Sequence, residues 1–377
     1  MTTLQTLPGK QPSFGPRRHL RLVWALAAKD IVDALKTKTT LITIIISLLM
    51  VAFYRYFPLL TSDADTLNVL LYAESTAGSE ELVTALQRSP ALAVYTYDSR
   101  DRLLEVFAGS ESVELAVVIP EEAATGQRSG EPLAIDGHVM YWVSPAQRAE
   151  MKALVEDELS TELGRPVTVN LTGHDVYFDA DTFFFVFSAT IALLFITLMI
   201  GISLIPNLMI EEKQAKTLDA LLVSPASATH LVAGKALAGL FYGLVGSAVV
   251  LVTFRYLIIR WDLALLAAVL ATLFMVAIGL LLGSYANVRA QLQLVAWFII
   301  IPLLIPVILV ALEGLVPSGA VAVLNWIPTV LIAKIFRLSL TPNASLAHFG
   351  APLAVTLAST LLLLALVVWV VRRQDRA

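Results

Sequence analysis

The sequence predicts an α-helical polytopic membrane protein with six transmembrane helices and an α/β domain between the first helix and the second. Hydrophobic residues make up 57% of the 377 residues, whereas soluble domains contain about 45–50% apolar residues. The apolar residues are concentrated in long uncharged runs, which one polar stretch interrupts at residues 59–182. This stretch is also acidic, because residues 59–181 carry 22 of the 30 acidic side chains and only 7 basic ones.

Residues 1–40 are expected to form a cytoplasmic tail and an amphipathic helix. Leu20 and Trp24 fall on one helical face, and Lys29 and Asp30 fall mostly on the other. This pattern is typical of a helix that lies in the membrane interface. A simple membrane anchor is the alternative interpretation.

Six runs are long enough to cross a bilayer, which requires about 20 predominantly apolar residues. They occupy residues 41–58, 183–210, 236–254, 263–288, 290–312 and 349–371. Residues 313–348 are also apolar, but Pro317, Pro328 and Pro342 interrupt them. Because proline disrupts helix interiors, we expect short interfacial or re-entrant helices there rather than a seventh span.

The polar stretch at residues 59–182 alternates strand and helix patterns, which predicts a small domain with a mixed sheet. Strands are expected at 66–74, 92–98, 113–120, 132–144 and 166–171. Helices are expected at 79–89, 100–109 and 145–164. A domain of this length can bury a core of its own, and the chain has no cysteine, so it has no disulfide framework.

Lysine and arginine in the short flanking segments predict the orientation. The termini and the loops after the second and fourth spans carry most of them: Lys10, Arg17, Arg18, Arg21, Lys29, Lys36, Lys38, Lys213, Lys216, Lys235, Arg289, Arg372, Arg373 and Arg376. The short loops on the opposite side carry only Arg255, Arg260, Lys334 and Arg337. The bias places both termini in the cytoplasm and the acidic domain outside, in a multi-pass protein of the plasma (inner) membrane.

The sequence lacks three familiar enzyme motifs. A phosphate-binding loop needs Gly-x4-Gly-Lys-Ser/Thr, and Gly234-Lys235-Ala236 lacks the first glycine and the hydroxyl. The five histidines do not form a His-Glu-x-x-His pattern, and the chain has no Gly-x-Ser-x-Gly elbow. We therefore expect no catalytic residue and no cofactor site in this chain.

One polar cluster could be imagined as a metal site. It follows the last expected strand and contains His174, Asp175, Asp179 and Asp181. A polar linker that enters the second span explains the cluster better, so we expect no metal there. Ionisable residues are nearly absent from the six spans, which argues against a transporter driven through an intramembrane proton or ion relay.

A charged segment follows the second span and carries a family pattern. The matching positions are Glu211, Glu212, Lys213, Thr217, Leu218, Leu221, Leu222, Ser224, Pro225, Gly234 and Lys235. This segment resembles the signature of ABC-2 type transporter permeases. The family often has a glycine where this chain has Lys216. The amphipathic helix, the large domain after the first span and the proline-containing segment before the last span extend the resemblance over most of the chain.

The resemblance implies a permease subunit of an ATP-driven exporter. A coupling helix within residues 209–235 would dock onto a separate ATPase subunit, with Leu218, Leu221 and Leu222 as its apolar face. Two permease chains, identical or different, would assemble with two ATPase subunits, which bind ATP and Mg²⁺. The phenylalanine-rich second span, with Phe184 and Phe187, and the fifth span, with Pro302 and Pro306, are candidates for the pathway. The prolines could equally form a structural kink.

Two other classes of function are possible. A membrane-anchored sensor or assembly factor would use the outer domain to bind a ligand, but such proteins usually carry a cytoplasmic output domain. A membrane enzyme such as a transferase would need a catalytic constellation, and the sequence shows none. The expected partners are the ATPase, a second permease chain and the lipid bilayer, with no nucleic acid.

Overall fold

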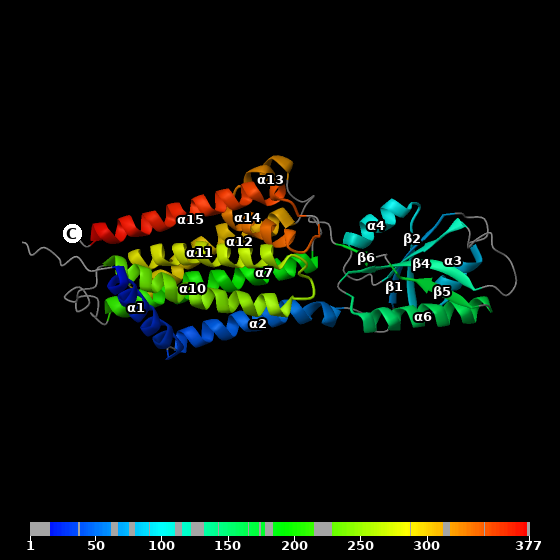
Figure 1. The fold of residues 1–377 in the computed structure, drawn as a ribbon, viewed down its shortest axis with the longest axis horizontal. Helices are drawn as coiled ribbons and strands as arrows, with labels where there is room; N and C mark the ends of the chain where they lie inside the picture. The colour runs from blue at the N-terminus through cyan, green and yellow to red at the C-terminus, as the bar shows by residue number, and fades with distance from the viewer. Residues whose placement is uncertain are drawn as a thin grey trace, which may run out of the picture.

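The computed structural model is an elongated molecule, with a helix bundle at one end and a sheet domain at the other (Figure 1). It describes residues 16–36, 38–61, 67–74, 80–89, 91–109, 115–121, 132–141, 143–164, 166–172, 175–177, 184–214, 228–286, 288–311, 317–342 and 344–374. Helix α1 and the C-terminal end of the last helix both lie at the end of the bundle that is farthest from the sheet (Figure 1).

The sheet domain confirms the expected alternation of strands and helices. Its elements are β1 (Leu67–Ala73), α3 (Glu80–Arg88), β2 (Leu92–Thr96), α4 (Arg100–Gly109), β3 (Leu115–Ile119), β4 (Leu133–Met140), α6 (Pro145–Leu163), β5 (Val167–Asn170) and β6 (Asp175–Val176). The strand order is β2-β1-β3-β4-β5, and β6 pairs with β4. The sheet is mixed because β1 runs parallel to β2 and β3, whereas β3 and β4 are antiparallel.

Helices cover both faces of this sheet. Leu86 of α3 and Val155 of α6 pack with Leu71 and Val117 on one face, and Phe107 of α4 packs against the other. Local residues set both ends of α6, the longest helix of the sheet domain. Ser144 caps its start and exchanges hydrogen bonds with Gln147 in a capping box. Gly164 ends α6 in the left-handed region, with φ +63°, where glycine meets no Cβ penalty.

Long helices form the bundle. They are α1 (Pro16–Lys36), α2 (Lys38–Thr61), α7 (Phe184–Met199), the π-helical turn η1 (Ile200–Leu204), α8 (Ile205–Gln214), α10 (Ala228–Thr253), α11 (Trp261–Tyr285), α12 (Arg289–Ala311) and α15 (Leu346–Gln374). Between α12 and α15 lie two shorter helices, α13 (Ser318–Leu324) and α14 (Pro328–Leu338). Both are too short to span a bilayer, in agreement with the short helices expected there.

Five of the described helical segments are long and apolar enough to cross a membrane: Phe187–Glu211, His230–Thr253, Trp261–Tyr285, Ala290–Val310 and Leu346–Val371. The protein is therefore a multi-pass membrane protein. The expected first span lies within helix α2, but its apolar stretch among the described residues is Ile44–Phe53. This stretch is shorter than the length a spanning helix needs, so a sixth span stays a prediction.

Glycines bring the central helices of the bundle into backbone contact. A Cβ added to Gly279 of α11 would lie 1.9 Å from the carbonyl oxygen of Gly201 in η1. The π-helical turn that contains Gly201 precedes Pro206, whose ring cannot fit a regular helix without displacing the preceding turn. Asn207 donates to the carbonyl oxygen of Ser203 at 2.8 Å, which satisfies one group of the irregular turn.

The sheet domain contacts the bundle at the end of β4. The Tyr141 hydroxyl donates to the carbonyl oxygen of Leu257, which lies between α10 and α11. Burial raises the pKa of Tyr141, so this hydroxyl stays protonated. Arg148 of α6 donates to the carbonyl oxygens of Val143 and Tyr141 and pairs with Asp175. Arg148 therefore fixes the segment that touches the bundle.

Candidate functional site

The candidate site is the end of the bundle that lies farthest from the sheet domain, where α8 ends, α10 begins and α1 crosses (Figure 1). Residues 211–214 continue α8, and residues 228–235 form the first part of α10. Thr217, Leu218, Leu221, Leu222, Ser224 and Pro225 lie outside the described residues. A separate coupling helix within 209–235 therefore stays a prediction, and the structure describes the two helices that flank it.

Lys213 joins α8 to the end of α11. Its Nζ donates to the carbonyl oxygens of Gly283, Ser284 and Ala286 at 2.9, 2.9 and 3.0 Å. Carbonyl groups at the end of a helix need donors from outside it, and the helix dipole favours a cation there. The half-buried position lowers the pKa of Lys213. Lys213 thus faces inward, whereas the sequence pattern predicts it in a segment that meets a partner.

Lys235 forms a buried ion pair with Asp30. The Lys235 side chain has no exposed area, and its Nζ lies 3.3 Å from Oδ2 of Asp30 in α1. The same ammonium donates to the carbonyl oxygen of Leu208 in α8 at 3.4 Å. One lysine of α10 therefore connects two other helices. The charges compensate each other, which a buried lysine requires.

Other contacts bring α1 against α10 along its length. A Cβ on Gly234 would lie 2.8 Å from Cβ of Leu26, so glycine permits this close approach. Tyr242 donates to the carbonyl oxygen of Ile31. Toward the start of both helices the rings of His19 and His230 stack with centroids 4.8 Å apart. Helix α1 is therefore part of the bundle as well as an amphipathic helix.

The exposed face of α1 keeps its large apolar residues. Leu20 and Trp24 are 71% and 65% exposed, whereas Ala27, Asp30 and Ala34 are buried. The large side chains are thus available to lipid, as expected of an interfacial helix. The sequence pattern placed Asp30 on the polar face and gave no indication of its partner, which lies 205 residues away.

The remaining predicted positions are spread over the molecule. Glu211 is half-buried near the end of α8. Glu212 and Phe184 lie in described helices, but their side chains are not among those that the structure describes. Phe187 is partly exposed and packs against the bundle core. Helix α12 runs on through Pro302 and Pro306, with Pro302 exposed and Pro306 buried. The structure does not bring these phenylalanines and prolines together with the residues at the end of α8.

The polar cluster before the second span holds Asp175, whose carboxylate pairs with Arg148. His174, Asp179 and Asp181 lie outside the described residues. Within the part of the chain that the structure describes, no group of three or more His, Cys, Asp or Glu side chains could hold a metal ion.

The long apolar helices and the inserted sheet domain define a multi-pass membrane protein with one large polar domain. The family model of the ABC-2 family transporter proteins matches residues 38–369, which is nearly the whole chain. The chain belongs to this family and is a membrane component of an ABC-2 transporter, a class that normally lacks ATPase motifs. No curated protein matches the chain at a significant level.

Proposed function

We propose that this chain is the permease subunit of an ATP-driven exporter in the plasma membrane. Two permease chains, identical or different, assemble with two ATPase subunits, and the ATPases bind ATP and Mg²⁺. Family membership supports this proposal, because an ABC-2 membrane component implies a partner ATPase. Gly234-Lys235-Ala236 lacks the first glycine and the hydroxyl residue of a phosphate-binding loop, which is consistent with an ATP site on another chain.

The observation that carries the proposal is the joint between the helices that flank residues 215–227. Lys213 ties the end of α8 to α11, and Lys235 ties the start of α10 to α1 and α8. A force applied to the intervening segment reaches four helices through these two lysines. Docking of an ATPase on Leu218, Leu221 and Leu222 would therefore move the bundle rather than a loose loop.

The proposed orientation places this joint and both termini in the cytoplasm. Helix α1 and the end of α15 lie together, opposite the sheet domain (Figure 1). Lysine and arginine are concentrated in the segments at that end, and the sheet domain is rich in acidic residues. The sheet domain then lies outside, at the exit of the transported substrate.

The substrate path is proposed to lie between two permease chains. Phe184 and Phe187 in the second span and Pro302 and Pro306 in the fifth are its candidate residues. The exposed position of Pro302 supports a role at a surface that faces lipid or a second chain. A sensor or assembly factor is the alternative, and membership of a transporter family favours the exporter.

The docking assignment is tested with Leu221→Asp and Leu222→Asp, because a charge on the proposed apolar face should prevent binding of the ATPase. Leu221→Met and Leu222→Met are matched controls that keep the face apolar. The measurements are co-purification of a tagged ATPase and the ATPase rate in liposomes. We expect both to fall at least tenfold in the aspartate variants, about the loss of one interface anchor. Normal values in both aspartate variants would refute the assignment.

A further inference from the structure

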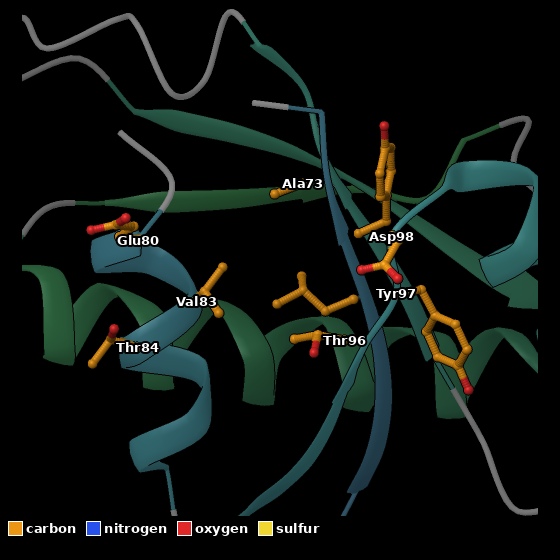
Figure 2. Close-up of a pocket in the computed structure, with 9 residues that line it drawn as sticks. Ala73, Glu80, Val83, Thr84, Thr96, Tyr97 and Asp98 are labelled. Atoms are coloured by element: carbon orange, nitrogen blue, oxygen red, sulfur yellow. The ribbon is translucent and has the colours of Figure 1, made fainter. Parts of the chain in front are cut away.

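A pocket of about 480 Å³ opens in the sheet domain at the carboxyl ends of β1 and β2. Figure 2 shows it between α3 and the sheet, with Val83 and Thr96 directed into the space. Its volume falls within the roughly 300–1,000 Å³ of small-molecule sites. The elements that line it, β1, β2 and α3, belong to the sheet domain, at the opposite end of the molecule from the start of α10 (Figure 1).

The path of the chain explains why a pocket forms there. After β1 the chain continues to α3 on one face of the sheet, and after β2 it continues to α4 on the opposite face. Because α3 and α4 lie on opposite faces, a crevice opens at the carboxyl edge of two neighbouring parallel strands. Ligands of open α/β sheets bind in crevices of this kind.

The lining of the pocket combines an apolar wall with negative charge. Leu71, Ala73 and Val83 supply apolar surface, Asp98 places a carboxylate beside the sheet, and Glu80 places one at the start of α3 (Figure 2). None of the described residues that line it is basic. The region around it adds to the negative potential, because residues 59–181 carry 22 acidic and 7 basic side chains.

The start of α3 is the feature that could favour an anion, because a helix N-terminus carries partial positive charge. Glu80 is the first residue of this helix and places a carboxylate at that point. A divalent cation is also a poor match, because it needs several clustered oxygen ligands. No such cluster of acidic side chains occurs in the part of the chain that the structure describes.

We propose that this pocket binds a small organic cation with an apolar body, of the quaternary ammonium class. The apolar wall holds the body of the ligand, Asp98 lies nearest its charge, and Glu80 at the rim adds to the negative potential. The proposal concerns equilibrium binding to the sheet domain and does not depend on the coupling of the chain to an ATPase.

The test uses the full chain in lipid nanodiscs and two probes of nearly the same shape. Benzyltrimethylammonium carries the charge, and 2-methyl-1-phenyl-2-propanol is its neutral counterpart. Ligand-observed NMR, with empty nanodiscs as the blank, measures the affinity of each probe. We expect saturable binding of the cation, at least fivefold tighter than binding of the alcohol. Because both carboxylates are exposed, salt should weaken binding of the cation.

Asp98→Asn and Glu80→Gln test the two carboxylates, and Asp157→Asn on α6 is the matched control outside the pocket. Each pocket variant should bind the cation about two- to fivefold more weakly, the upper part of the range for one solvent-exposed charge pair. The control should bind as the parent chain does. An unchanged melting temperature of the pocket variants would exclude misfolding. Equal affinity for the two probes, or unchanged binding by both pocket variants, would overturn the proposal.

Discussion

Leu71, Val117 and Val155 fill the core of the sheet domain, whereas Gly201, Gly279 and the Lys235–Asp30 pair occupy the inner contacts of the bundle. In water, burial of large aliphatic side chains drives folding. In a bilayer, lipid solvates apolar side chains equally well, so association depends on close packing and polar contacts. The difference teaches that a loss of side-chain volume should be most costly in the sheet domain, and a gain of volume or a broken polar contact most costly in the bundle.

The largest effect is expected from breaking the buried ion pair. Lys235→Met removes the buried cation of Asp30 and leaves the carboxylate only the half-exposed ammonium of Lys29, 3.6 Å away, which should cost about 3 kcal/mol of stability. The double variant Lys235→Met/Asp30→Leu should recover most of this loss, because no uncompensated charge remains. Thermal unfolding in detergent measures both. Lys36→Met is the control, because Lys36 pairs with Asp33 at the surface, and it should change stability by less than about 0.5 kcal/mol.

A loss of volume should be costly in the sheet domain. Leu115 is fully buried in its core, so Leu115→Ala should remove about 3 kcal/mol of stability from this domain. Hydrogen exchange followed by mass spectrometry should show faster exchange in β1, β3 and β4 and unchanged exchange in α10 and α11. Leu154→Ala on the exposed side of α6 serves as control. Equal acceleration in both regions would mean that they unfold as one unit.

A gain of volume should be costly in the bundle. Gly279→Ala would place a Cβ against the carbonyl oxygen of Gly201, and backbone atoms cannot move aside easily. We expect a loss of about 2 kcal/mol, seen as a lower melting temperature in detergent. Gly319→Ala is the control, because a Cβ there meets nothing within 4 Å. A stable Gly279→Ala variant would show that the helices can separate without penalty.

Local patterns predicted most of the sheet domain and the positions of the long helices. Strand and helix periodicity marked β1 to β5, α3, α4 and α6, because each element buries a face with its own spacing. Strand β6 was missed because it has only two residues within a polar segment. The π-helical turn at Gly201 was also missed, because its apolar residues keep the helical pattern and Pro206 after it was read as part of a continuous span.

The candidate site was predicted as a segment but not as a set of contacts. The pattern from Glu211 to Lys235 marked the joint between two membrane helices. It gave no sign that Lys213 caps α11 or that Lys235 pairs with Asp30. Both contacts join residues far apart in sequence, and sequence periodicity reports only on neighbours along one element. Lys213 and Lys235 were therefore interpreted as parts of the family pattern and of the orientation signal, without their contacts inside the bundle.

The central claim is that the sheet domain and the joint between α8 and α10 face opposite sides of the membrane. Single cysteines at Ser129 and Ser227 test it directly, because the native chain contains no cysteine. An impermeant maleimide applied to intact cells should label Ser129→Cys and leave Ser227→Cys unlabelled, and permeabilised cells should show both labelled. The reverse pattern in intact cells, or labelling of both positions there, would contradict the claim.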